Sequence, residues 1–176
     1  MIKVFGATGV VSDVEQLVEH ILVFSKKYSV VIQVLNADMV FGVSHLISAA
    51  EHAIRAMRQK RNSTNSLAME VLLYASGERQ IKLGIQKMGV RSKKNRIAFV
   101  VIDQVSDISE TKGTISDNDI EMILKELRFV RDDKVLEGDR DTLKNFGFTG
   151  KEMKTVVPAK YGQLILERVA MVDVIK

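Results

Sequence analysis

The segment from Tyr74 to Ile81, with the sequence YASGERQI, combines residue types that can hold an anion. It follows an almost wholly apolar stretch, residues 65–74, and turns at once from Ser-Gly into Glu-Arg-Gln. Gly77 is suited to end a helix because glycine enters the left-handed region without strain, and Glu78 can begin the next helix. Backbone N–H groups at the start of a helix attract anions, and Arg79 would add a positive charge. The segment therefore predicts a helix boundary, an anion site, or both.

A second candidate site is the stretch Gly6-Ala-Thr-Gly9, between an expected strand and an expected helix. In dinucleotide-binding folds, glycines in such a turn let a pyrophosphate approach the N-terminus of the helix. Ser12 stands where that fingerprint has its third glycine, and no regular alternation of strands and helices follows. A dinucleotide-binding oxidoreductase is therefore the alternative hypothesis, and a plain glycine turn is the simpler interpretation.

Residues for metal binding or covalent catalysis are scarce. The chain has no cysteine and only three histidines, of which His45 and His52 lie too far apart on one straight helix for joint ligation. It contains no His-Glu-x-x-His, no Gly-x-Ser-x-Gly and no Walker-type phosphate loop. The sequence thus predicts no catalytic residue, no metal site and no cofactor, and we expect a protein that is not an enzyme.

Positive charge is concentrated in one part of the chain. The window from Arg55 to Arg96 has eleven basic and two acidic residues, a net charge of +9, whereas the remainder carries −5. Such a distribution favours one surface for polyanions and another for a different partner. Tyr74 is the single aromatic residue in the window, so a platform of stacked aromatic rings for RNA bases is not indicated. A solvated helix face is the simpler alternative.

Hydrophobic periodicity predicts the elements that would position these residues. The expected strands are Ile2–Phe5, Ser29–Leu35 and Ile97–Asp103, with an extended segment at Phe129–Glu137. The expected helices are Ser12–Lys27, Ser44–Arg61, Ser66–Ala75, Glu78–Met88, Asp117–Leu127, Asp139–Phe146, Thr149–Lys154 and Tyr161–Val174. Ser12 and Glu15 have the spacing of a capping box, and Ile81, Ile85 and Met88 form an expected inner stripe.

Together these elements predict one α+β domain over residues 1–176, with a small mixed or antiparallel sheet packed with several helices. No apolar run approaches the roughly 20 residues needed to cross a bilayer, so we expect no membrane segment. The start of the chain has no secretory h-region. With the lack of cysteine, this favours a cytoplasmic protein.

Several motifs taken together resemble the TPRKB family, the PRPK-binding proteins, in an archaeal form. They are LNAD at Leu35–Asp38, His45-Leu46 leading into residues 49–56, MEVLLYASGERQI at Met69–Ile81, KMGV at Lys87–Val90 and LERVAMV at Leu166–Val172. The most specific part is the Ala75–Ile81 core with the Met69-Glu70 pair one helix earlier. Residues 111–148 match the family only loosely.

The resemblance implies a non-catalytic subunit of the KEOPS complex, which makes the threonylcarbamoyl modification of adenosine beside the anticodon of tRNAs. Such a subunit binds the small atypical kinase of the complex, stimulates its ATPase or kinase activity, and captures tRNA through the single-stranded 3′ CCA end. It would meet the rest of KEOPS indirectly. A scaffold that binds the kinase and never touches RNA is a further hypothesis.

The resemblance also implies where these partners bind. The residues expected to contact tRNA are Ser76, Gly77, Arg79, Gln80, Lys82 and Arg55, and the apolar side chain of Ile81 is available for a terminal base. A purely capping role for Ser76 and Gly77 is the alternative. The residues expected to contact the kinase lie on the C-terminal helix at Leu164, Arg168, Met171 and Val172. Core packing would also explain the apolar residues of that helix.

Overall fold

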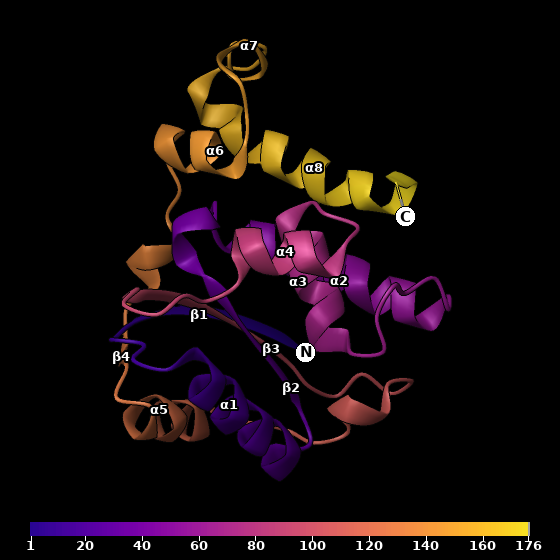
Figure 1. Ribbon diagram of the computed structural model, residues 1–176. Helices are drawn as coiled ribbons and strands as arrows, with labels where there is room; N and C mark the ends of the chain where they lie inside the picture. The colour runs from indigo at the N-terminus through magenta and orange to yellow at the C-terminus, as the bar shows by residue number, and fades with distance from the viewer. Residues whose placement is uncertain (176) are drawn as a thin grey trace.

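A four-stranded antiparallel sheet with helices on both faces forms the centre of the computed structural model, which describes residues 1–175 (Figure 1). The strands, in their order across the sheet, are β2 (Val31–Asn36), β3 (Arg96–Ile102), β1 (Ile2–Thr8) and β4 (Val130–Arg131). Strand β3 pairs antiparallel with both β1 and β2, while β4 pairs only with the end of β1. The predicted α+β class and the small antiparallel sheet are confirmed.

The helices follow the predicted pattern with shifted ends. Within residues 1–175 the α-helices are α1 (Val14–Tyr28), α2 (Val43–Arg58), α3 (Leu67–Ser76), α4 (Ile81–Met88), α5 (Asp117–Glu126), α6 (Arg140–Phe146), α7 (Gly150–Met153) and α8 (Tyr161–Ile175). The segment expected to be extended at residues 129–137 forms the short strand β4 and then a 3₁₀ turn, Asp133–Leu136. None of the helices within the described range is both long and apolar enough to span a bilayer.

Capping side chains set where several helices begin. Asp13, and not Ser12, caps α1: its carboxylate accepts the backbone N–H of Gln16 at 3.1 Å. The predicted capping box of Ser12 and Glu15 is therefore wrong, because the N-cap residue is Asp13. A true capping box opens α5, where Ser116 and Asp119 each accept the backbone N–H of the other.

Strand β3 is the centre of the sheet, and its sequence RIAFVVI shows why. A strand covered on both faces needs apolar residues at every position, because successive side chains point to opposite sides. The buried apolar residues form two core clusters, one on each face of the sheet. Ala98, Val100 and Ile102 of β3 belong to the first cluster, and Ile97, Phe99 and Val101 belong to the second.

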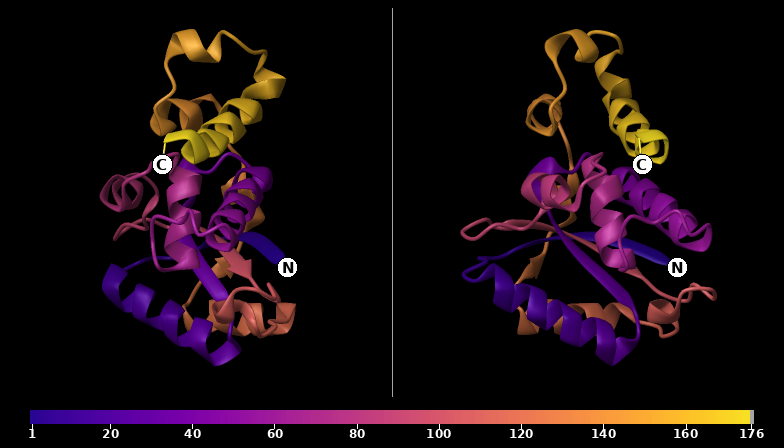
Figure 2. Two further views of the ribbon diagram at one scale, coloured as in Figure 1. Left: turned by 90° about the vertical axis from the view of Figure 1, so that its right-hand side faces the viewer. Right: turned by 45° about the vertical axis from the view of Figure 1, so that its right-hand side comes forward.

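The two core clusters define the layers of the molecule. Helices α1 and α5 cover one face of the sheet, and α2 and α3 cover the other, with α4 beside them (Figure 1). The segment from α6 to α8 forms an outer layer beyond α2 and α3, so it does not touch the α1 face (Figure 2). Apolar residues of this outer layer, including Phe146, Ile165 and Val169, extend the same core that α2 and α3 form with the sheet.

Strand β1 is longer than predicted, and this changes the meaning of its glycines. Gly6 and Ala7 lie inside the strand and pair with Ala98 and Ile97 of β3, so they form no turn before a helix. A Cβ atom on Gly6 would lie 2.4 Å from a methyl carbon of Val135. The glycine is therefore needed for close packing. The strand that follows α1, β2, runs in the same direction as β1 but is not its neighbour, because β3 lies antiparallel between them. The glycine turn on which the dinucleotide-binding alternative was based therefore does not form at Gly6 and Ala7.

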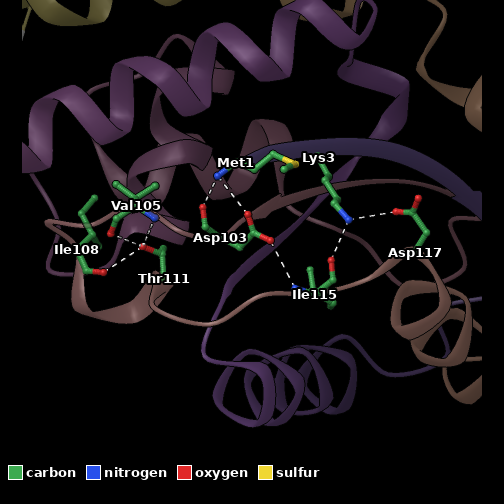
Figure 3. A network of polar contacts seen from close by, with 8 residues as sticks. All are labelled: Met1, Lys3, Asp103, Val105, Ile108, Thr111, Ile115 and Asp117. Atoms are coloured by element: carbon green, nitrogen blue, oxygen red, sulfur yellow. Dashed lines mark hydrogen bonds and ion pairs between the residues drawn. The ribbon is translucent and has the colours of Figure 1, made fainter.

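The carboxylate of Asp103, at the end of β3, ties the following loop to the start of β1 (Figure 3). It is buried and forms an ion pair with the amino group of Met1 at 3.1 Å, and it accepts the N–H of Ile115 at 3.4 Å. Lys3 donates to the carbonyl of Ile115 at 2.8 Å and to Asp117 at 3.1 Å. These bonds hold the poorly matched loop before α5 against the sheet.

Candidate nucleic-acid interface

The predicted anion site begins at the end of α3, where backbone groups are already used by the helix itself. Gly77 adopts a left-handed conformation with φ of 69°, and its N–H donates to the carbonyl of Tyr74 at 3.1 Å. The N–H of Glu78 donates to the carbonyl of Leu73 at 3.2 Å. These two bonds form a Schellman motif, so neither N–H group is directed to an external anion.

Ser76 belongs to the same cap. Its side chain is fully buried, and its hydroxyl donates to the carbonyl of Leu73 at 2.8 Å and accepts the N–H of Glu78 at 3.3 Å. The expected contact between the Ser76 hydroxyl and tRNA therefore has no exposed atom to make it. The capping alternative describes this residue, because its polar group is satisfied inside the protein.

Helix α4 begins at Ile81, three residues later than predicted. Gln80 is its N-cap residue and makes no capping hydrogen bond with its side chain. The first bond within the helix runs from the N–H of Gly84 to the carbonyl of Gln80 at 3.0 Å. The N–H groups of residues 81–83 precede that bond and have no acceptor within the helix. The anion-attracting helix start is therefore present, displaced toward Lys82.

The predicted inner stripe of α4 is correct at Met88 and wrong at Ile81 and Ile85. The residues that face the core are Gly84 and Met88, while Ile81, Leu83 and Ile85 are 41%, 42% and 45% exposed. A Cβ atom on Gly84 would lie 2.9 Å from a leucine methyl carbon of α3. The two helices approach each other closely at this glycine, and the approach turns the isoleucines outward.

Four predicted tRNA contacts are exposed, and two of them meet α8. Arg55 is bonded to Asp173 of α8, with 2.8 Å between Nη2 and Oδ2. Arg79 donates from Nη1 to the carbonyl of Ile175 at 3.3 Å. Gln80 and Lys82 are exposed, and Lys82 makes no ion pair or hydrogen bond with side chains or backbone in residues 1–175. The structure therefore brings Arg55 and Arg79 together at the last turn of α8, while Gln80 and Lys82 lie at the start of α4.

The four predicted kinase contacts divide into two pairs. Leu164 and Val172 are 8% and 0% exposed and pack in the core, so the expectation that their side chains contact a kinase is not supported. Their spacing along α8 places both on the face that covers α2 and α3. Met171 is 43% exposed, whereas Arg168 is partly exposed and lies over the end of α3.

Arg168 links the two predicted surfaces. Its guanidinium lies 4.7 Å from the ring centroid of Phe148 and pairs with Glu152 at 3.1 Å. Its aliphatic carbons cover Gly77: a Cβ atom on that glycine would lie 2.7 Å from Cγ of Arg168. The residues predicted for tRNA and for the kinase are therefore direct neighbours, although 91 positions separate them in the sequence.

Asp173 was not predicted, and it is the centre of the polar contacts in this region. The hydroxyl of Tyr74 donates to its Oδ1, and the side chains of His52 and Arg55 each lie 2.8 Å from its Oδ2. Arg61 donates to its backbone carbonyl at 3.1 Å. The one sequence signal was an isolated carboxylate near the end of an apolar helix. Nothing in that signal identified the partners, which come from α2, α3 and the loop between them.

These contacts shift the pKa values of the Asp173 carboxyl group and the Tyr74 hydroxyl. Partial burial works against the charged form of Asp173, but the hydrogen bonds from Tyr74, Arg55 and His52 outweigh it and hold the pKa below its ordinary value. Burial and the neighbouring carboxylate raise the pKa of the Tyr74 hydroxyl. At neutral pH the pair is therefore an ionised carboxylate and a neutral phenol.

The basic window keeps much of its charge. Five of its side chains pair with carboxylates: Arg55, Arg58, Lys87, Lys94 and Arg96. The other six make no ion pair within residues 1–175: Lys60, Arg61, Arg79, Lys82, Arg91 and Lys93. Cations without an acidic partner are available to attract polyanions.

The histidines have structural surroundings. His45 is fully buried, accepts the N–H of Phe41 at Nδ1 and bonds the carbonyl of Ala75 through Nε2 at 2.8 Å. Burial lowers the pKa of His45 to about 4, so the ring is neutral. Within residues 1–175, no group of three or more potential ligands has the geometry to hold a metal ion.

The structure is an α+β domain in which the basic start of α4 lies beside the outer helix α8. Residues 9–173 match the family model described as kinase binding protein CGI-121. The chain is also 31% identical, over 146 residues, to the regulatory protein Cgi121 of Methanocaldococcus jannaschii, a match that covers 82% of this chain and 84% of that protein. The chain belongs to the CGI-121 family, and the resemblance to TPRKB proteins in their archaeal form is confirmed.

Proposed function

We propose that this protein is a non-catalytic regulatory subunit of the KEOPS complex, which binds the small atypical kinase and recruits tRNA through its 3′ CCA end. The kinase part is supported by the description of the family as kinase binding and of the archaeal relative as regulatory. The observation that carries the RNA part is the start of α4, where uncapped N–H groups, Arg79 and Lys82 lie together beside an exposed isoleucine.

Each of these features suits a different part of a single-stranded RNA end. The N–H groups at the start of α4 and the charges of Arg79 and Lys82 suit phosphate oxygens. The exposed side chains of Ile81 and Leu83 offer an apolar surface for an unstacked base. An unpaired 3′ end presents both kinds of group within a few nucleotides, whereas the bases of a duplex are stacked.

On the kinase side, Met171 is exposed and Arg168 is partly exposed. We assign Leu164 and Val172 to packing α8 onto α2, which would hold these two residues in place. Because Arg168 also covers Gly77, a kinase bound there would lie next to the proposed RNA site. One small protein would then hold the RNA end and the kinase together.

Co-purification and RNA binding test the two parts separately. The protein is mixed with the kinase-like subunit, and complex formation is measured for the wild type and for Met171→Glu. RNA binding is measured by gel shift with intact tRNA and with tRNA that lacks its CCA end. We expect a shift that depends on the CCA end. A kinase complex together with equal, weak binding of both tRNAs would favour the protein-only scaffold over the RNA proposal.

A further inference from the structure

Three arginines from different places in the chain point their guanidinium groups at the last turn of α8. Arg55 of α2 bonds the carboxylate of Asp173 at 2.8 Å, and Arg61, just beyond α2, bonds the backbone carbonyl of the same residue at 3.1 Å. Arg79, between α3 and α4, bonds the carbonyl of Ile175 at 3.3 Å. The end of a helix carries partial negative charge on its free carbonyls, and Asp173 adds a full one. The last turn thus presents anionic oxygens to cations that are otherwise available to phosphate.

This turn is held by polar contacts more than by packing. Val172 is the last fully buried residue of α8, while Val174 is 73% exposed and Ile175 is 39% exposed. Beyond Val172, the polar contacts to the body of the protein within residues 1–175 are those of Asp173 and the carbonyl of Ile175. The arginines that contact this turn are exposed, and hydrogen bonds and ion pairs at such positions contribute little stability each, so their exchange for phosphate contacts costs little.

We propose that Asp173 and the last turn of α8 compete with RNA phosphates for Arg55, Arg61 and Arg79, and so lower the affinity of this protein for tRNA. This inference rests on the proposed function, because it concerns the regulation of the same basic region. In the RNA-bound state the arginines exchange helix-end oxygens for phosphate oxygens, and the last turn of α8 is displaced. By linkage, any partner that draws this turn away from the arginines raises the RNA affinity.

The competing explanation predicts the opposite change in RNA affinity when the charge of Asp173 is removed. If Asp173 only orients Arg55 for RNA, removal of its charge weakens RNA binding. If Asp173 competes, removal of its charge strengthens binding. Asp173→Asn separates the two, because the amide oxygen can still accept the Tyr74 hydrogen bond while the ionic hold on Arg55 is lost.

The matched control is Glu167→Gln, which removes one negative charge from an exposed position of the same helix that pairs with none of these arginines. Binding to intact tRNA is measured over a range of salt concentrations. For Asp173→Asn we expect affinity about two- to fivefold above that of the control, and a salt slope steeper by about 0.7 for each additional phosphate that the arginines bind. Adding Arg55→Gln to Asp173→Asn should remove most of this increase. Affinity equal to or below that of Glu167→Gln would overturn the proposal.

A second measurement uses the unaltered protein, in case Asp173→Asn affects folding. Backbone amide exchange is followed with and without saturating tRNA. The competition predicts faster exchange in residues 172–175 when RNA is bound. Unchanged or slower exchange there would contradict it. If the wild type binds no tRNA in either experiment, the proposed function itself fails, whereas failure of the competition alone leaves wild-type binding intact.

Discussion

The hydroxyl of Tyr74 in α3 donates a hydrogen bond to the carboxylate of Asp173 in α8, 99 positions further along the chain. Tyr74 is fully buried, and its ring lies 5.4 Å from that of His52. The one aromatic residue of the basic window is therefore an anchor for the C-terminal helix and not a surface for base stacking. The same bond fixes where α8 ends relative to the arginines of the proposed RNA site.

Charge reversal at Arg79 should weaken tRNA binding strongly. Arg79→Glu removes a proposed phosphate contact and adds repulsion, so we expect at least about a tenfold loss of affinity at low salt and a smaller salt slope. The control Lys26→Glu makes the same charge change at an exposed position on α1, on the opposite face of the sheet. Equal effects of the two changes in a gel-shift assay would show that only net charge matters.

The exposed isoleucine of α4 should matter for RNA and not for folding. Ile81 is 41% exposed, so Ile81→Ser is expected to change the free energy of unfolding by less than about 0.5 kcal/mol. It should reduce the preference for intact tRNA over CCA-trimmed tRNA. Met88→Ser, at a buried position of the same helix, should instead lower stability by about 2–4 kcal/mol. Unfolding curves and RNA binding measured on both variants check this contrast.

Gly77 should be intolerant of any side chain. Its φ of 69° costs other residues about 1–2 kcal/mol, and an added Cβ would meet Arg168 at 2.7 Å. We expect Gly77→Ala to lower the free energy of unfolding by about 1–3 kcal/mol. Gly150→Ala is the control, because a Cβ there has no atom within 4 Å and the residue is helical. Denaturant unfolding that ranks the two variants equally would contradict this account.

Loss of the Tyr74 hydroxyl should lower the free energy of unfolding by an amount that depends on pH. Tyr74→Phe removes a bond to an ionised carboxylate, which we expect to cost about 1–3 kcal/mol at neutral pH. The pKa of Asp173 is lowered in the folded state, so its stabilisation is complete above the unfolded value of 3.8 and is lost as the pH falls below it. The stability difference between wild type and Tyr74→Phe should therefore shrink in acid. A constant difference from neutral pH down to strong acid would rule out a role for the carboxylate charge.

Protonation of His45 should oppose folding in mild acid. Burial lowers the pKa of His45 to about 4 from 6.5, so the unfolded chain binds a proton that the folded chain does not. Stability from this group is complete above pH 6.5 and falls by up to about 1.4 kcal/mol per pH unit until about pH 4. His45→Gln should be less stable at neutral pH but lose less stability between pH 6.5 and about 4, as measured by denaturant unfolding at several pH values.

Local pattern was sufficient for most elements of the fold. The continuous apolar run of β3 indicates a strand covered on both faces, and the apolar periodicity of α1, α2 and α8 places these helices to within a few residues. The prediction was wrong where the local pattern suited two kinds of structure. The Gly6–Gly9 stretch resembles a turn because glycine is common in turns, yet β1 continues to Thr8. Gly6 is glycine because a Cβ atom inside the strand there would meet Val135.

The candidate site was predicted in part. The YASGERQI motif located the helix junction and the exposed cations, but periodicity alone placed Ile81 and Ile85 inside. A short helix with apolar residues on two faces has no unique inner side, and the close approach at Gly84 decided which face was buried.

The sequence by itself determined the family, the class of fold and the concentration of positive charge between Arg55 and Arg96, because these depend on local composition and short motifs. Only the tertiary structure decided that Asp173 lies among those cations and that Arg168 covers Gly77. Both contacts join segments about 90 to 120 positions apart. Side-chain pairs of that kind leave no periodic signal in one sequence, since they are set by how the outer layer packs onto α2 and α3.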